Sequence, residues 1–253
     1  MLDLHTHLIG HQDRPANREN IQDYLEAARR AGLQEIGFSD HDMYLEDLNL
    51  PLIREVAEEY PDLKVRVGLE VDYRAEDEAK IQTLLQTFPF DYVIGSVHEI
   101  KNWLFDYPDQ APKHREVDPD QLYLEYFSLV EKAARSQLFT TIGHFDLIKI
   151  FGVRPRTDVR ELAANALQAI VENGLVAELN TAGRYKPVGE FYPERKLIQE
   201  MVNRGIEFTL GSDAHEAQYV GRDLSEATHL LQACGVKRLI RFEQKKRLTL
   251  PLS

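Results

Sequence analysis

Short runs of β-forming residues alternate with amphipathic helical segments along the chain of 253 residues. In the first helical segment, Ile21, Tyr24, Leu25 and Ala28 share one helix face, and Gly32 follows as a stop signal. Seven strands are predicted, at LDLH (2–5), EIGFS (35–39), KVRVGLEV (64–71), DYVIGSV (91–97), LFTTIG (138–143), LVAELN (175–180) and IEFTLG (206–211). Strands separated by helices pair in parallel, so the pattern predicts an α/β protein, either a barrel or a doubly wound sheet.

The chain is acidic, with 30 Lys and Arg against 42 Asp and Glu and a formal net charge of -12. Such a surface repels phosphate backbones and argues against a nucleic-acid partner. Apolar runs fall short of the roughly 20 residues that a membrane helix needs, so no membrane partner is expected. The single Cys234 cannot form an internal disulfide, and the N-terminus does not resemble a signal peptide. We expect one domain over residues 1–253, working in the cytoplasm.

Histidines and carboxylates gather where the predicted strands end. In chain order they are His5 and His7, Asp40 and His41, Glu70 and Asp72, His98, His144 and Asp146, and Asp213 and His215. In a parallel α/β barrel the carboxyl ends of the strands converge on one face, where such enzymes place their active sites. Six of the nine histidines are therefore predicted to point into one small volume.

Such crowding is costly unless a cation holds the side chains together. Imidazole nitrogen and carboxylate oxygen suit Zn, Mn or Fe, and a carboxylate can bridge two ions. His5 and His7 lie two residues apart on a strand, so they share one face and can chelate one ion. A lone His-x-His pair is more often a chance surface pair, but repetition at six strand ends predicts a metal centre.

Seven motifs together resemble the PHP (polymerase and histidinol phosphatase) superfamily of metal-dependent phosphoesterases, and within it the histidinol-phosphate phosphatases. They are DLHTH (3–7), SDHD (39–42), GLEVDY (68–73), FDYVIGSVH (90–98), IGHFD (142–146), ELNTAG (178–183) and LGSDAH (210–215). The resemblance covers nearly the whole chain. It implies a distorted seven-stranded parallel (β/α)7 barrel, similar to a TIM barrel, with three divalent metal ions (Zn, Mn and/or Fe) at the C-terminal ends of the strands.

The resemblance also assigns ligands to each ion. It implies that one ion is held by His5, His7, Glu70 and Asp213, and that Glu70 bridges to a second ion held with His98 and His144. His41 and His215 would hold the third ion. For a further ligand to that ion, family spacing points to Asp13 and the Gly-His pair of the same loop points to His11, with Asp13 slightly favoured.

Metals of this kind indicate phosphate-ester chemistry. Divalent ions lower the pKa of a water that they bind and neutralise phosphoryl oxygens, so hydrolysis of a monoester requires no protein nucleophile. The leaving oxygen has to be protonated, and Asp213, Asp40 or a water on the metals are candidates.

Basic residues near two strand ends are candidates for binding substrate. Arg184 and Lys186 follow the sixth strand, and Arg154 follows the fifth. The planar guanidinium of Arg184 matches a phosphate, and Lys186 or Arg154 can assist as a point charge. A cationic end of the substrate would need an acidic contact, for which the unranked candidates are Glu99, Asp106 and Glu190.

Three functions follow from these patterns. The leading prediction, implied by the resemblance, is hydrolysis of L-histidinol phosphate to L-histidinol and phosphate in histidine biosynthesis. The alternative is a phosphoesterase of the same superfamily that acts on another small phosphate ester or on a nucleotide, with DNA disfavoured by the acidic surface. A metal-binding module without enzyme activity is the weakest prediction, because every cluster position carries a competent ligand.

Overall fold

A computed structural model describes residues 1–252. Within that range the main sheet has nine strands, which are hydrogen-bonded to one another in chain order. They are β1 (Leu2–Thr6), β2 (Glu35–Phe38), β3 (Lys64–Asp72), β4 (Tyr92–Ser96), β7 (Thr141–Ile142), β8 (Val176–Asn180), β9 (Phe208–Gly211), β10 (Arg238–Glu243) and β11 (Lys246–Pro251). Neighbouring strands are parallel except for the antiparallel pair of β10 and β11. The prediction of an α/β protein with a parallel sheet is confirmed.

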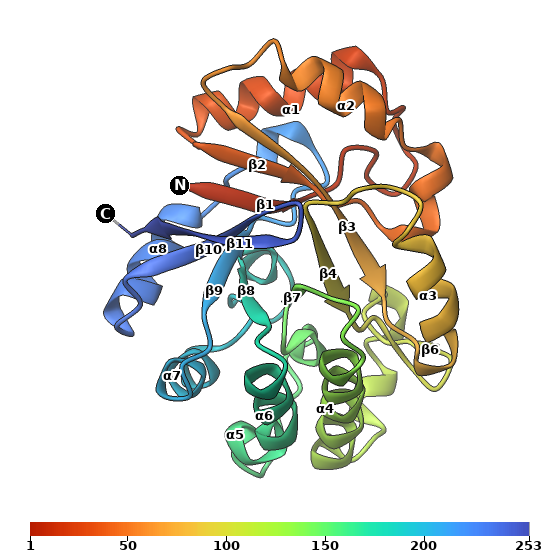
Figure 1. The fold of residues 1–253 in the computed structure, drawn as a ribbon. Helices are drawn as coiled ribbons and strands as arrows, with labels where there is room; N and C mark the ends of the chain where they lie inside the picture. The colour runs from red at the N-terminus through yellow and green to blue at the C-terminus, as the bar shows by residue number, and fades with distance from the viewer. Residues whose placement is uncertain (253) are drawn as a thin grey trace.

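The helices lie around the outside of the strands (Figure 1). They are α1 (Arg18–Arg30), α2 (Leu50–Ala57), α3 (Glu78–Leu84), α4 (Pro119–Arg135), α5 (Val159–Leu162), α6 (Ala164–Glu172), α7 (Arg195–Asn203) and α8 (Leu224–Ala233). The Asn17 side chain caps α1 by accepting from the backbone N–H of Asn20, and the predicted apolar face of this helix is buried. Each of these helices buries at least one apolar side chain. None of the helices within residues 1–252 is long and apolar enough to cross a membrane.

The seven predicted strands are present, but a barrel of seven strands is not confirmed. Residues 238–251 add β10 and β11, so the sheet is mixed and has nine strands. A short hairpin of β5 (Glu99–Ile100) and β6 (Trp103–Leu104) forms a second, separate sheet. These four strands lie outside the seven predicted ones.

Strand β9 has different neighbours at its two ends. At its start, Phe208 pairs with Leu239 of β10. Just beyond its end, Ala214 forms a parallel bridge with Thr6 of β1. The hairpin of β10 and β11 therefore separates β1 from β9 on the N-terminal side of the sheet, while the two strands meet on the C-terminal side, where the histidines lie.

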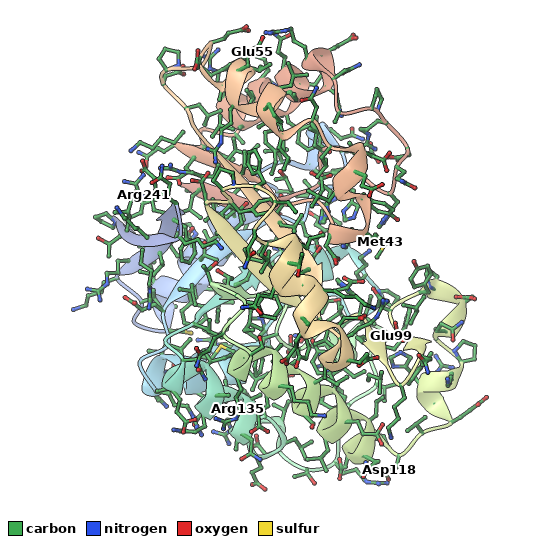
Figure 2. The ribbon with its side chains drawn as sticks, turned by 45° about the vertical axis from the view of Figure 1, so that its right-hand side comes forward. Met43, Glu55, Glu99, Asp118, Arg135 and Arg241 are labelled. Atoms are coloured by element: carbon green, nitrogen blue, oxygen red, sulfur yellow. The ribbon has the colours of Figure 1, made fainter. Side chains whose placement is uncertain are left out.

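The turn of this hairpin contacts the N-terminal ends of β3 and β4. The backbone N–H of Lys245 donates to the carbonyl oxygen of Asp91 (2.8 Å), and the rings of Tyr92 and Phe242 stack at 6.2 Å. Arg66 joins the hairpin to β2 by ion pairs with Glu243 and Glu35. Figure 2 shows Arg241 of β10 on the opposite side of the molecule from Met43 and Glu99, which follow strand ends.

Candidate metal centre

The strand ends bring the predicted ligands into contact. Three groups have ligand atoms that all lie within 4.8 Å of one another, and these are His5, His7 and Glu70; His7, His41 and His215; and His41, Glu70 and His98. Two further predicted ligands adjoin them. His144 Nε2 lies 2.9 Å from Glu70 Oε1, and His7 Nε2 lies 3.1 Å from Asp213 Oδ1. Residues from six separate strand ends therefore form one cluster.

Glu70 lies at the middle of this cluster, and its side chain is 1% exposed. Its Oε2 is 3.3 Å from His5 Nε2, 3.6 Å from His7 Nε2 and 3.1 Å from His41 Nδ1. Its Oε1 faces the other side, toward His144 and His98, and accepts a hydrogen bond from the Ser96 hydroxyl (2.6 Å). A carboxylate that faces histidines on both sides has the arrangement of a bridging ligand.

Several imidazole nitrogens of the cluster are buried without a hydrogen-bond partner in residues 1–252. They are His5 Nε2, His7 Nδ1, His41 Nδ1, His144 Nδ1 and His215 Nε2. Buried polar atoms are normally paired, and a metal ligand needs a free nitrogen lone pair. The donor set of imidazoles and carboxylates fits divalent metal ions.

The electrostatics of the cluster agree with this fit. Burial acts to lower the pKa of His5, but the Glu178 and Glu70 carboxylates outweigh it and hold that pKa well above its ordinary value. Burial, together with His215 and His41, holds the pKa of His7 well below its ordinary value. Burial raises the pKa of Glu70, yet His5 and His41 bring it well below its ordinary value. Among these groups the carboxylates favour a proton on His5 but not on His7, and a metal ion bound at His5 would take the place of that proton.

Two carboxylates outside the predicted ligand set orient histidines of the cluster. His5 Nδ1 donates to Glu178 Oε1 at 2.6 Å, and His98 Nδ1 donates to Asp72 Oδ1 at 2.6 Å. Burial acts to lower the pKa of His98, but Asp72 raises it to about 10. Each bond turns the Nε2 of its histidine toward the other ligands. Carboxylate–histidine pairs of this kind fix the tautomer and orientation of metal ligands.

The loop after β1 places His11, rather than Asp13, beside the third group of histidines. The His11 ring lies 4.5 Å from the His215 ring and 5.8 Å from the His41 ring. Asp13 is 60% exposed and forms an ion pair with Arg14 at 3.0 Å. The geometry favours His11 as the additional ligand, whereas the sequence slightly favoured Asp13.

The two candidate proton donors differ in their surroundings. Asp40 is buried, and its Oδ1 accepts from the backbone N–H of Ile9 at 2.9 Å, which holds the loop after β1. Burial raises the pKa of Asp40 to about 7. Burial also raises the pKa of Asp213, but His5 and His7 outweigh it and hold that pKa well below its ordinary value. The surroundings of Asp213 thus favour its ionised form, whereas Asp40 contacts the backbone of the loop after β1.

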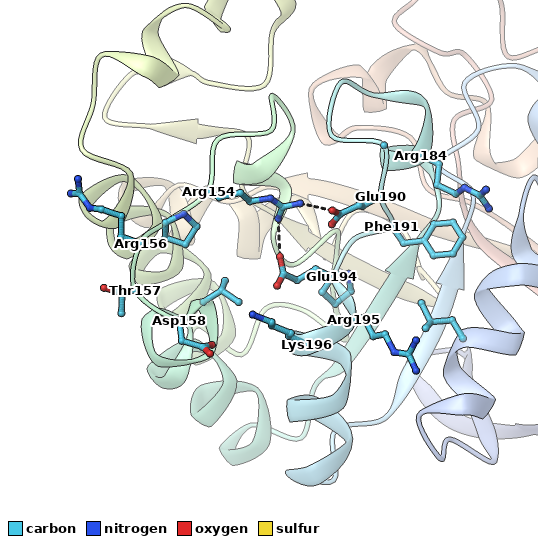
Figure 3. A pocket seen from close by; sticks show the side chains of 15 residues that line it. Arg154, Arg156, Thr157, Asp158, Arg184, Glu190, Phe191, Glu194, Arg195 and Lys196 are labelled. Carbon is cyan, nitrogen blue, oxygen red and sulfur yellow. Dashed lines mark hydrogen bonds and ion pairs between the residues drawn. The ribbon is translucent and has the colours of Figure 1, made fainter.

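A cavity of about 820 Å³ lies between the segments that follow β7 and β8 (Figure 3), and none of the predicted metal ligands lines it. Arg154 and Arg184 both line it. Arg154 is paired with Glu190 and with Glu194, each at 2.7 Å, and Figure 3 shows Arg184 directed away from these acids. The Arg184 guanidinium lies 5.2 Å from the centre of the Phe191 ring. Lys186 lies outside this cavity, and its charge contributes to lowering the pKa of His11, after burial and His215.

Comparison with known proteins shows which protein family the chain matches. The family model described as PHP domain matches residues 3–182. A protein of Deinococcus radiodurans named "Probable histidinol-phosphatase" is 39% identical, over 96% of both chains. A Bacillus subtilis protein named "Histidinol-phosphatase" is 29% identical over 86% of this chain and 94% of its own length.

A solved structure resembles the whole fold. It is histidinol phosphate phosphatase from Lactococcus lactis, complexed with Zn, L-histidinol and phosphate, and it superposes with a TM-score of 0.78. The sequence identity is 25%, and the match covers 98% of both chains. The resemblance expected from the motifs is confirmed, and this chain belongs to the PHP domain family.

Proposed function

We propose that this protein hydrolyses L-histidinol phosphate to L-histidinol and phosphate, and that it does so in histidine biosynthesis. The buried cluster of histidines and carboxylates at the strand ends is the observation that carries the proposal. It is supported by relatives named histidinol-phosphatase along nearly the full chain, and by a similar structure whose complex contains zinc, histidinol and phosphate. We further propose that residues 1–253 act in the cytoplasm as one domain, with the sheet as a distorted barrel.

The proposed cofactors are three divalent ions, drawn from Zn, Mn and Fe. When bound, they would supply Lewis acids for the phosphoryl oxygens and a nucleophile derived from water at neutral pH. In this proposal Glu70 is shared by two of the ligand groups. Glu178 orients His5, and Asp72 orients His98. The Asp213 carboxylate, whose pKa is held well below its ordinary value, serves as an anionic ligand. The proposed ligands are His5, His7, His11, His41, Glu70, His98, His144, Asp213 and His215, with Asp13 as the alternative to His11.

The phosphate contacts proposed are Lys186 and Arg184. Lys186 is exposed and lies close enough to His11 to affect its pKa, so its ammonium can meet a phosphate that approaches the cluster. Arg184 is 42% exposed, and its nearest acid, Asp223, is 3.6 Å away. Arg154 is the weaker candidate because two carboxylates already occupy its guanidinium.

Replacing either proposed contact is expected to weaken substrate binding without loss of metal. We expect Lys186→Ala and Arg184→Ala each to raise KM by about 10-fold, the size of one charge-assisted contact. Steady-state kinetics would be measured alongside elemental analysis. Arg195→Ala is the matched control, because Arg195 lines the same cavity but lies at the start of α7. If both variants keep the KM of the unmodified protein, these residues do not bind the phosphate.

A panel of phosphate esters tests the proposed reaction. The purified protein should contain two to three divalent ions per chain and should prefer histidinol phosphate to serine phosphate and para-nitrophenyl phosphate. Equal kcat/KM on all three esters would instead favour a general phosphoesterase. A metal-loaded protein that hydrolyses none of these esters and no nucleotide would indicate a metal-binding module without enzyme activity.

A further inference from the structure

Three polar atoms near the metal centre are buried without a hydrogen-bond partner in the described chain. They are Asp106 Oδ1, Asp146 Oδ1 and the hydroxyl oxygen of Tyr192. Asp146 and Tyr192 are each 1% exposed. A buried carboxylate oxygen or phenol without a partner is costly, and native proteins rarely leave one without a reason.

Tyr192 borders His144 directly, and the segment that carries Asp106 reaches His144 through Tyr126. The rings of Tyr192 and His144 lie 6.4 Å apart. Phe105, which precedes Asp106, packs on Tyr126 at 5.6 Å, and the Tyr126 hydroxyl donates to the carbonyl oxygen of His144 (3.4 Å). Burial raises the pKa of Tyr192 far above its ordinary value, and the carboxylates of Asp146, Asp213 and Asp106 add to this effect. The phenol therefore stays protonated among acidic groups.

The three acidic residues that could bind a cationic end of the substrate differ in whether a basic side chain already pairs with them. Glu99 is paired with Arg74 at 2.9 Å. Glu190 is paired with Arg154 at 2.7 Å, and Lys149 lies 3.5 Å from it. Asp106 has no basic side chain within 4.0 Å among residues 1–252. Asp146, by contrast, is neutralised by the buried Lys149 at 2.9 Å. Asp106 is therefore the uncompensated negative charge on this side of the metal centre.

The chemistry of the proposed substrate matches this position. In histidinol phosphate, the carbon that bears the amino group is bonded to the carbon that bears the phosphate oxygen. A phosphate at the metals consequently places the protonated amine beside them. An ammonium offers three N–H donors and no acceptor, so a carboxylate and a phenol oxygen are suitable partners.

We propose that Asp106, supported by the Tyr192 hydroxyl, binds the protonated amine of the substrate and sets the preference for an amino-bearing phosphate ester. The inference rests on the proposed function and makes Asp106 a specificity-determining residue. It also gives a role to the loop between β4 and α4, which carries Asp106.

Two esters and three variants test this role. The esters are histidinol phosphate and its analogue with hydrogen in place of the amino group. For Asp106→Asn we expect kcat/KM to fall about 10- to 30-fold on histidinol phosphate and less than about 3-fold on the analogue, because only the first ester loses an ionic contact. Tyr192→Phe should give a smaller change with the same selectivity. Glu99→Gln is the matched control and should leave the ratio between the two esters unchanged.

Metal content and thermal unfolding of each variant would show whether the centre and the fold are intact. If Asp106→Asn and Tyr192→Phe lower kcat/KM equally on both esters, or change neither, the inference is overturned while the proposed function stands. If the unmodified protein hydrolyses neither ester, the proposed function fails, and the inference fails with it.

Discussion

Glu70→Ala is expected to lose at least about 1000-fold in kcat and to purify with less than half of the metal of the unmodified protein. The reason is its central position. Both carboxylate oxygens face histidines, with Oε2 toward His5 and His41 and Oε1 toward His144. A single substitution therefore removes a donor from two proposed ions and leaves buried imidazoles without their anionic partner.

Two further variants separate loss of the ligand from general damage. Glu70→Gln keeps the volume of the side chain but removes its charge, so it should also lose metal. Asp91→Asn changes another carboxyl that is 1% exposed, but at the hairpin side of the sheet, and it should retain metal. Elemental analysis and calorimetric zinc titration would provide the measurements. Full metal content in both Glu70 variants would show that Glu70 is not a ligand.

Glu178→Ala is expected to weaken binding of one metal ion by about 100-fold, at the upper end of the effect of removing a partner that orients a ligand. Glu178 is buried, and its Oε1 accepts from His5 Nδ1 while its Oε2 accepts from the backbone N–H of His144 at 2.8 Å. Glu178 thus aligns the side chain of one proposed ligand, His5, and the backbone of a second proposed ligand, His144. A Cβ at Gly211 would collide with this carboxylate, so glycine is needed there.

Glu178→Gln should recover only part of the affinity. A glutamine has one carbonyl oxygen, which can accept from His5 or from His144 but cannot replace both carboxylate oxygens. Glu35→Gln is the control, because Glu35 is equally buried but pairs with Arg66 and Arg241 away from the centre. Competition with a chelator would measure the affinities. An unchanged affinity in Glu178→Ala would mean that His5 is oriented without it.

The clustering of the proposed ligands was predictable because it depends on a local rule, namely that parallel strands expose their carboxyl ends on one face. His5 and Glu70 needed only a strand assignment to be placed together. The partner of each imidazole depends on side-chain contacts between distant segments, and the bond between His5 and Glu178 spans 173 residues. No spacing in the sequence reports such a contact. Glu178 stood inside the motif ELNTAG, but its strand position alone did not reveal its partner.

The choice between His11 and Asp13 shows a different limit. Gly10 and Gln12 both have positive φ angles, of 58° and 63°, so the loop after β1 reverses direction within a few residues. Spacing along the chain then no longer predicts which side chain faces the cluster. The hairpin of β10 and β11 was missed although it is local, with six antiparallel residue pairs between residues 238 and 251. Its single residue pair with β9, by contrast, joins distant segments and could not be read from the sequence.

The position of β1 sets the order in which the molecule can be completed during translation. β1 leaves the ribosome before the other strands, but its contact with the segment after β9 awaits residues made much later, since the backbone N–H of Ser212 donates to Asp3 across a separation of 209 residues. The hairpin that covers the N-terminal ends of β3 and β4 follows later still. A nascent chain therefore holds the ligands from β1 to β4 before Asp213 and His215 exist. Binding of the full set of proposed ions would then be a late, largely post-translational event, and a chain truncated before residue 213 would lack the proposed ligands Asp213 and His215.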